Sequence, residues 1–525
     1  MSSKSIGRAL LAAALLSPAA ARAQDRGAFV MTSGADTILV ERFTRTADSV
    51  AVMADLTGKA RMAYVLHTAA DASVSALELR LWGAGAPDSA PPLQHGNVVL
   101  AGDSAVSTFT SGAQVGVQRA HGTRGAVLMI IPSALMLEQV LMRARALSPR
   151  DSAAVPVFVP GGRNEPIPGR VRWVGADSAV LSLGPLEVRA RVDAAGRILG
   201  AVVPAQNLVI ARVADARAAG ARRDYSAPAG APYTAEEVRV PHPEGFQLAG
   251  TLTLPKERRG RVPAVITITG SGQEDRDEAV PVLPGYGIFR EVADTLGRRG
   301  IAVLRMDDRG FGASGGNPMQ ATSRDFAGDI AAAVAYLRTR PEIDPGRIAL
   351  VGHSEGGIIA PMLAAQDPRL HAVVLIAGTS RTGRRVLDYQ FRRGADADPA
   401  RSPAQRDSAY RAAWAEMDAM AARVPWLPFF YDYDPLPTAA KLRQPVLILQ
   451  GATDRQVTAD QAPELEAAIR GGGNRDVTLR LFANLNHLMV PDPDGNPAGY
   501  ATLPSPKVSR EVLGTLADWL ASKLR

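Results

Sequence analysis

The segment LVGHSEGGIIA, residues 350–360, decides the fold, because it joins a short β-branched run to a helical one around a single serine. The residues before it favour a strand, and the apolar spacing after it favours a helix. A G-x-S-x-G motif between a strand and a helix is typical of a nucleophile elbow, where the serine sits in a strained conformation. Gly352 and Gly356 avoid the collisions that side chains would cause there, and Gly357 lets the helix pack close to the sheet. The segment predicts Ser354 as a catalytic nucleophile.

Two strands joined by a Pro/Gly turn, VRVPHPEGFQLAGTLTLP, are expected shortly before six apolar runs. Continuous apolar strands that alternate with helices are typical of a mostly parallel sheet with helices on both faces. Ser354 follows the third of the six runs, which are PAVITITG, IAVLRMDD, RIALVG, AVVLIAG, PVLILQG and VTLRLF.

A serine nucleophile needs a base that takes its proton and an acid that fixes the tautomer of the base. His487, in FANLNHLMVPD, follows the last expected strand in a loop, where such a base belongs. Asp454, in PVLILQGATDRQV, lies just past another strand, and Asp460 is the fallback acid. The chain order Ser354, Asp454, His487 is that of α/β-hydrolases. We therefore predict these three residues as a catalytic triad.

Acyl transfer also needs backbone N–H groups that stabilise the negative oxygen of the tetrahedral intermediate. The N–H of Glu355, at the start of the expected helix, supplies one. The loop ITGSGQEDRDE after the first parallel strand should supply the other, because its glycines let N–H groups turn toward the site. This leaves Ser271 or Gly272 as the second donor. The charged residues at 275–277 and 307–309 are expected to tie neighbouring loops together beneath the site rather than to contact substrate.

The motifs GSGQEDRDE, MDDRGFGASGG, GHSEGG, QGATDRQV and NHLMV together resemble those of bacterial serine carboxylesterases of the EstD type, within the α/β-hydrolase superfamily. The resemblance covers residues 234–525. It implies an α/β-hydrolase fold and hydrolysis of a small-molecule ester by the triad, without a cofactor or a metal. The region before residue 234 lies outside the resemblance, which therefore implies no fold or function for it.

Composition limits the other classes of function. The chain has 525 residues, a formal net charge of +7 and no cysteine. The arginines are spread along the chain without a run of five basic residues, so we expect no nucleic-acid partner. The absence of cysteine excludes disulfides, cysteine-ligated metals and a thiol nucleophile.

The N-terminus has the pattern of a secretory signal peptide over residues 1–23. Lys4 and Arg8 precede a short apolar core, and Ala21-Arg22-Ala23 is an A-x-A cleavage site. No later segment is apolar for 18 residues, so we expect no transmembrane segment. These features predict export across the inner membrane, with the bacterial periplasm as the destination.

The sequence pattern of residues 24–213 predicts an antiparallel β-rich domain. Short alternating runs recur about every ten residues without a fixed period, interrupted by one expected helix over 133–147. Residues 214–233 are rich in Ala, Gly and Pro and read as a linker to a catalytic domain over 234–525. The β-rich domain could dock to a partner or the cell envelope, form a homodimer, or cover the active-site mouth, and its sequence does not rank these roles.

An insertion of about 60 residues, 381–440, separates AVVLIAG from PVLILQG and is longer than a usual α/β connection. It holds nine of the 27 aromatic residues of the chain. We predict a helical lid that roofs Ser354 and a substrate that is an acyl or aryl ester.

Three alternatives share parts of this pattern. A peptidase of the prolyl-oligopeptidase type has the same catalytic domain but usually a repeated β-propeller upstream. A thioesterase would use the same triad, although acyl-CoA is scarce outside the cytoplasm. A non-catalytic binding protein would tolerate the loss of a triad residue, yet all three are present.

Overall fold

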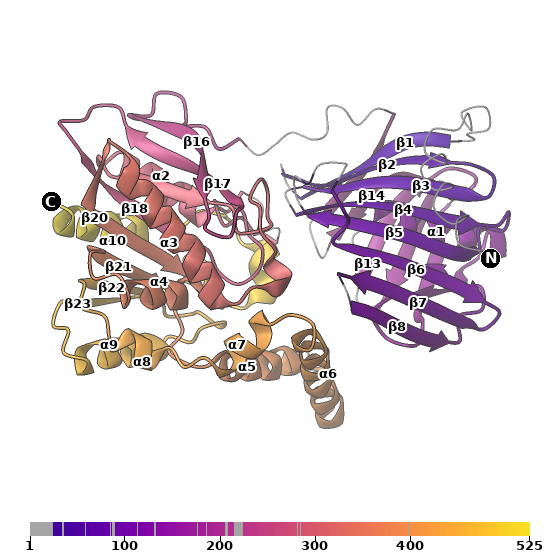
Figure 1. Cartoon of the computed structure of the whole chain (residues 1–525). Coiled ribbons are helices and arrows are strands. Elements are labelled where there is room, and N and C mark those ends of the chain that lie inside the picture. The colour runs from indigo at the N-terminus through magenta and orange to yellow at the C-terminus, as the bar shows by residue number, and fades with distance from the viewer. Residues whose placement is uncertain are drawn as a thin grey trace, which may run out of the picture. The chain divides into compact units, whose positions relative to one another are not determined.

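The computed structural model describes residues 25–525 except 34–35, 58, 84–85, 87–89, 113, 131–132, 176, 185, 205–207, 215–223, 281, 284 and 398. The expected signal peptide lies outside the described residues, as do residues 215–223 of the expected linker. The chain folds as two compact units, Met1–Arg222 and Arg223–Arg525 (Figure 1). No helix in the described part of the chain is long and apolar enough to cross a membrane.

The first unit is one 15-stranded sheet in the order β8-β7-β6-β5-β4-β3-β2-β1-β15-β14-β13-β12-β11-β10-β9. All neighbours pair antiparallel except β9 and β10, which are parallel. The expected β-rich N-terminal region is therefore confirmed. Its strands are β1 (Asp25–Ser33), β2 (Asp36–Arg45), β3 (Ser49–Leu56), β4 (Ala60–Thr68), β5 (Val74–Gly83), β6 (Gln94–Ala101), β7 (Ser104–Ser111), β8 (Gln114–His121), β9 (Val127–Leu128), β10 (Ala153–Phe158), β11 (Ile167–Trp173), β12 (Ser178–Leu183), β13 (Leu186–Val192), β14 (Ile198–Val203) and β15 (Leu208–Val213).

Helix α1 (Ala134–Leu147) packs against this sheet and confirms the helix expected over 133–147. Its first turn is held by the buried carboxylate of Glu41, which accepts hydrogen bonds from the backbone N–H groups of Ala134 (2.7 Å) and Leu135 (2.9 Å). Glu138 is fully buried on the helix, and Arg45 donates to its carboxylate at 2.6 Å. The polar residues of α1 are thus paired, which allows most of the helix to be buried.

The second unit has an 8-stranded sheet in the order β16-β17-β19-β18-β20-β21-β22-β23. The strands from β18 to β23 are mutually parallel, whereas β17 pairs antiparallel with β16 and β19. The six expected parallel strands and the hairpin before them are all present. They are β16 (Tyr233–Pro241), β17 (Gln247–Pro255), β18 (Val262–Ile268), β19 (Ala302–Met306), β20 (Ile343–His353), β21 (Ala372–Ile376), β22 (Val446–Gly451) and β23 (Val477–Phe482).

Helices cover both faces of this sheet and divide its core in two. One cluster of buried side chains includes α3, α4 and α9, and the other includes α2 and α10. The mostly parallel sheet with helices on both faces is therefore confirmed. The helices are α2 (Ile288–Gly297), α3 (Ser323–Thr339), α4 (Gly356–Ala364), α5 (Gly383–Asp396), α6 (Pro403–Ala421), α7 (Trp426–Asp432), α8 (Leu436–Ala439), α9 (Gln461–Gly471) and α10 (Arg510–Lys523), with short 3-10 turns at Pro318–Gln320 and Pro497–Thr502.

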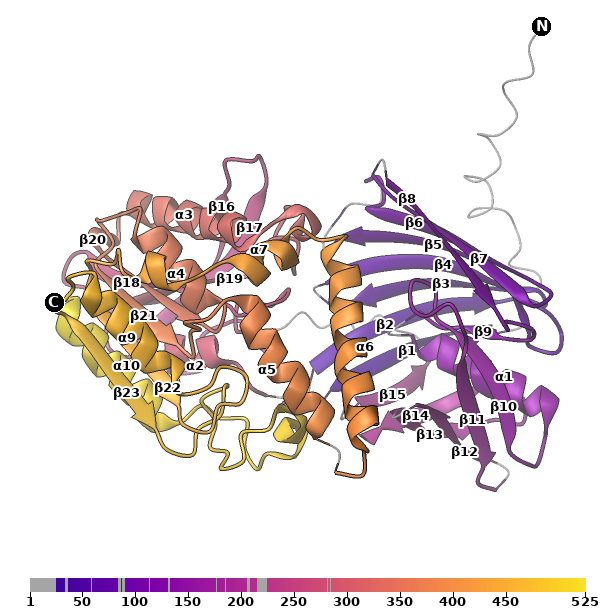
Figure 2. The same cartoon turned by 90° about the horizontal axis from the view of Figure 1, so that it is seen from below.

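The insertion at 381–440 forms the helices from α5 to α8, and α5 lies beside α6 and α7 (Figure 2). Phe430 of α7 packs in the sheet core, with its ring against Gly383 at the start of α5. Helix α6, in contrast, has no buried residue. The aromatic side chains of α7 therefore fasten the insertion to the sheet, and its role as a lid stays a prediction.

Residues 224–232, at the end of the expected linker, contact the second unit. Arg290 of α2 donates to the backbone oxygens of Asp224 and Ser226. The ring of Tyr225 lies under the guanidinium of Arg276, 4.2 Å from ring centroid to Cζ. This part of the segment therefore belongs to the C-terminal unit.

Candidate active site

Ser354 occupies the corner between β20 and α4 with a φ of +53°, in the left-handed region that a non-glycine residue rarely adopts. Its backbone N–H donates to the carbonyl of Ile376 (2.9 Å) at the end of β21, which holds the corner against the sheet. The neighbouring glycines leave no room for a side chain. A Cβ on Gly352 would lie 2.0 Å from the carbonyl oxygen of Gly356, and one on Gly356 would lie 2.2 Å from that of Ile268. The strain at Ser354 is therefore imposed by its surroundings.

The structure brings His487 and Asp454 together, although they come from loops after different strands. His487 Nδ1 lies 2.8 Å from Asp454 Oδ2, and both side chains are buried. The other oxygen, Asp454 Oδ1, accepts from the backbone N–H groups of Gln456 (2.8 Å) and Val457 (2.9 Å). The carboxylate is thus fixed in position, and a hydrogen bond from Nδ1–H would leave Nε2 of His487 free to accept a proton.

Gln450, at the end of β22, completes this arrangement and was not anticipated. Its side-chain amide donates to Asp454 Oδ2 at 3.0 Å. Asp460, the fallback acid, instead directly precedes α9 and pairs with Arg381. Of the two acids considered, only Asp454 contacts His487 among the described residues.

Ser354 Oγ makes no hydrogen bond to His487 in the described structure. Both lie at the carboxyl edge of the sheet, after β20 and β23. Hydrogen bonds between a nucleophile and its base are often long in a free enzyme and tighten when substrate binds. Of the two contacts that the predicted triad requires, the described structure therefore has the one between His487 and Asp454. A hydrogen bond between Ser354 and His487 is not formed in it.

The three expected oxyanion donors lie around this corner. Glu355 directly follows Ser354, where the first N–H groups of a helix lack partners within the helix. Ser271 and Gly272 are exposed, and Gly272 has a φ of +123°, which favours glycine. The side chain of Ser271 acts to lower the pKa of the Glu355 carboxyl, so the two donor segments lie close together. The described contacts do not choose between Ser271 and Gly272.

The side chain of Glu355 has a separate role that its motif did not reveal. It is buried and accepts hydrogen bonds from Ser323 Oγ (2.5 Å) on α3 and from Trp426 Nε1 (2.7 Å) on α7. Burial raises the pKa of the Glu355 carboxyl, while the side chains of Ser323, Trp426 and Ser271 oppose that shift. Glu355 therefore connects the elbow to α3 and to the insertion.

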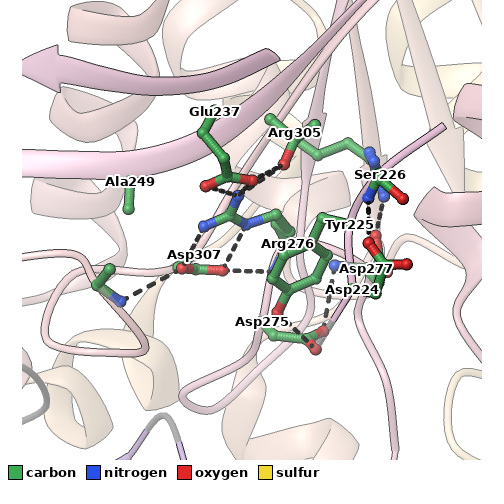
Figure 3. A network of polar contacts seen from close by, with 12 residues as sticks. Asp224, Tyr225, Ser226, Glu237, Ala249, Asp275, Arg276, Asp277, Arg305 and Asp307 are labelled. Atoms are coloured by element: carbon green, nitrogen blue, oxygen red, sulfur yellow. Dashed lines mark hydrogen bonds and ion pairs between the residues drawn. The ribbon is translucent and has the colours of Figure 1, made fainter. Parts of the chain in front are cut away.

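The charged loop after β18 is held beneath the site rather than directed into it. Figure 3 shows the guanidinium of Arg276 between Asp307 and Glu237. Arg276 makes a bidentate pair with Asp307 (2.8 and 2.9 Å) and donates to Glu237 (2.7 Å) and to Thr251 Oγ1 (2.6 Å). Because Arg276 is 2% exposed, it fastens this loop to β16, β17 and the end of β19.

A cavity lies beside the donor loop, at the ends of β18 and β19 and against helices α3 and α4. Gly270 and Gly272 line it, and so do Asp307, Asp308 and Arg309, which the sequence had placed beneath the site. Asp308 accepts from Thr269 Oγ1 (2.6 Å) and from the backbone N–H of Glu274 (2.9 Å). Burial raises the pKa of Asp308 well above its usual value. The apolar lining residues are Leu248, Ile268, Met306, Phe326, Ile330 and Ile359.

Among the described residues, no group of three or more His, Asp or Glu side chains is arranged to hold a metal ion. The groups described at this corner are the serine, the histidine, the carboxylates and the backbone N–H groups.

Comparison with known proteins identifies a matching family model and several similar proteins. The family model described as Serine aminopeptidase, S33 matches residues 282–397. The esterase EstD of Thermotoga maritima is 28% identical over 293 residues, which cover 53% of this chain and 68% of that protein. The uncharacterised peptidase YuxL of Bacillus subtilis is 24% identical over 268 residues, covering 48% of this chain and 35% of that protein.

Among solved structures, an esterase of Pyrococcus furiosus aligns with 57% of this chain and 94% of its own. The sequence identity is 18% and the TM-score is 0.40.

Proposed function

Because the chain contains an EstD-like α/β-hydrolase segment, we propose that the protein is a serine hydrolase that cleaves carboxylic esters through an acyl-enzyme intermediate. The observation that carries this proposal is the combination of a strained Ser354 on the nucleophile elbow with a buried hydrogen bond between His487 and Asp454. Serine, histidine and aspartate in these positions are the parts that acyl transfer requires.

In the proposed first step, Ser354 Oγ attacks the carbonyl carbon of the ester while His487 Nε2 takes the hydroxyl proton. Asp454 holds the Nδ1–H of His487 and stabilises the imidazolium that forms. The oxyanion is stabilised by the N–H of Glu355 together with that of Ser271 or Gly272. His487 then gives its proton to the departing alcohol oxygen, and Ser354 remains acylated.

In the second step, a water molecule gives a proton to His487 and its oxygen attacks the acyl carbon. Collapse of the second tetrahedral intermediate returns the proton from His487 to Ser354 Oγ and releases the carboxylic acid. No cofactor enters either step, since each proton moves between Ser354, His487, water and the leaving alcohol.

The substrate class is tested with a panel of model compounds of matched size. We expect the purified protein to hydrolyse 4-nitrophenyl esters of short acyl chains with kcat/KM at least about tenfold above that for matched aminoacyl 4-nitroanilides and thioesters. The cavity beside Gly270 and Gly272, which is lined by both apolar and charged side chains, would receive one side of such an ester. Hydrolysis of the anilides alone would assign the protein to the peptidases instead.

A second candidate function is hydrolysis of aminoacyl amides. It is favoured by the family model, described as a serine aminopeptidase, and by the similarity to a protein named as a peptidase. The first unit carries a single, mostly antiparallel 15-stranded sheet rather than repeated blades. We therefore place the amide-cleaving function second.

We also propose that the protein is exported and acts in the periplasm. The support is the basic start, apolar core and A-x-A site within residues 1–23. Expression of the full chain in a bacterium should yield a periplasmic protein whose first residue is Gln24, as read by N-terminal sequencing. A protein that stays in the cytoplasm with residues 1–23 attached would contradict export and leave the proposed chemistry untouched.

A further inference from the structure

A second histidine–carboxylate pair lies directly behind the nucleophile. His353, the residue before Ser354, has its Nδ1 2.5 Å from Glu278 Oε1 and its Nε2 2.9 Å from the backbone carbonyl oxygen of His487. The rings of His353 and His487 are 4.9 Å apart. Both His353 and Glu278 are buried, so solvent does not compete for these contacts.

These two contacts define the protonation of His353. A carbonyl oxygen and a carboxylate oxygen can only accept hydrogen bonds, and a neutral imidazole has a single N–H to donate. With Glu278 ionised as a carboxylate, both contacts are hydrogen bonds only when His353 is the doubly protonated imidazolium. Burial lowers the pKa of His353, but the Glu278 carboxylate and the hydrogen bonds together raise it above its usual value.

Glu278 joins this pair to the donor loop. The oxygen that faces His353, Glu278 Oε1, also accepts from the backbone N–H of Gly270 at 3.2 Å. Gly270 in turn lies against the nucleophile, since a Cβ placed on it would be 3.3 Å from Ser354 Cβ. Glu278 holds this position with a φ of +54°, which is strained for a residue with a side chain.

We propose that Glu278 and the imidazolium of His353 are positioning residues. They hold three loops in fixed positions relative to one another, as the proposed esterase reaction requires. His353 fixes the elbow that carries Ser354, Glu278 fixes the donor loop at Gly270, and the contact with the His487 carbonyl fixes the loop that carries the base. Neither residue exchanges a proton with substrate, so their effect lies in geometry. A displacement of about 1 Å at such a site can cost about 10²-fold in rate.

The variants His353→Gln and Glu278→Gln test this role in the full-length protein. Gln in place of His353 removes the cation, and Gln in place of Glu278 removes the anion while keeping a hydrogen-bond acceptor of the same size. We expect each to lower kcat for a 4-nitrophenyl ester by about 10- to 100-fold, with KM within about threefold of wild type. The rate at which a fluorophosphonate labels Ser354 should fall by the same factor.

His371 supplies a matched control. Both of its ring nitrogens also face oxygen atoms, the carbonyls of Gly346 (3.1 Å) and Lys523 (2.9 Å), but it precedes β21 at the edge of the sheet away from Ser354. His371→Gln removes the same number of ring contacts, so we expect stability to change while kcat stays within about threefold of wild type.

The pH dependence separates positioning from simple loss of stability. The groups that face His353 are Glu278, His487 and, through its charge, Asp454. The pKa of His353 is higher in the folded protein than in the unfolded chain. The imidazolium therefore stabilises the folded arrangement fully at pH values below the unfolded pKa of about 6.5, and this stabilisation is lost as the pH rises through the folded pKa. Wild-type kcat should therefore decline at alkaline pH. The decline should start at lower pH in Glu278→Gln, whose imidazolium has lost its counter-ion, and be absent in His353→Gln.

The outcomes are distinct. Loss of kcat in both Gln variants, with the alkaline decline shifted in one and absent in the other, supports the proposal. Variants that match His371→Gln in kcat and share the wild-type alkaline decline overturn it, while the esterase function stands. If the wild-type protein hydrolyses no ester and is not labelled at Ser354, the proposed function is wrong. The positioning role, which rests on that function, is then wrong as well.

Discussion

Ser354→Ala should abolish ester hydrolysis while leaving the fold intact. Without the hydroxyl no acyl-enzyme can form, so kcat should fall by at least about 10⁴-fold, to the level that the oxyanion donors and substrate binding support by themselves. The side chain is only partly buried, and its hydroxyl makes no hydrogen bond within the described residues, so its loss should cost little stability. Steady-state kinetics on a 4-nitrophenyl ester, with thermal unfolding of the same sample, measures both effects.

A matched change separates the nucleophile from its surroundings. Ser271→Ala removes a hydroxyl from the neighbouring loop but keeps the backbone N–H that would contact the oxyanion. We expect it to retain at least about a tenth of the wild-type rate. Retention of a tenth of that rate by Ser354→Ala would refute the assignment of the nucleophile.

Asp454→Asn should lower kcat by about 10³- to 10⁴-fold with a much smaller change in KM. An amide at this position can donate to His487 Nδ1, which favours the tautomer with its proton on Nε2 and leaves no site to accept the proton of Ser354. The backbone N–H groups of Gln456 and Val457 would still hold the side-chain oxygen, so the loop should keep its shape. Initial-rate kinetics at several substrate concentrations separates kcat from KM.

Asp460→Asn is the control for this change. Asp460 lies six residues further on, is largely exposed and pairs with Arg381 instead of with His487. Its substitution should leave kcat within about threefold of wild type. If Asp460→Asn proves damaging and Asp454→Asn harmless, the acid has been assigned to the wrong residue.

The elbow could be predicted from sequence because its constraints are local. Gly352, Gly356 and Gly357 stand within six residues, and each position has backbone atoms less than 3 Å from where a Cβ would lie. The parallel strands could also be predicted from the sequence. Strands β19, β21 and β22 are buried along their whole length, so each appears in the sequence as an almost unbroken apolar run.

Other features of the fold depend on partners far apart in the chain. The position of β19 between β17 and β18 follows from pairing across the sheet, which the periodicity of one strand does not contain. Strand β8 in the first unit is another such case. In β8, seven of the eight residues are not buried, and its two valines, Val115 and Val117, are exposed rather than turned to a core.

In the candidate site, too, some residues could be predicted from the sequence and others could not. Ser354, Asp454 and His487 were found from their residue type and their place after strands. The partners that hold them were not, because Glu278 is 75 residues from His353 and Trp426 is 71 residues from Glu355. A histidine directly before a nucleophilic serine looks like an ordinary elbow residue until the structure shows two acceptors at its ring nitrogens.

The central claim, that Ser354 is an activated nucleophile, is tested most directly by covalent labelling of the wild-type protein with a fluorophosphonate. The account predicts stoichiometric phosphonylation, observed as a single adduct by intact-mass spectrometry and located on Ser354 by peptide mapping, with ester hydrolysis lost in proportion. The Ser354→Ala variant should remain unlabelled. An adduct on another residue, or full esterase activity with Ser354 unmodified after exhaustive labelling, would contradict it.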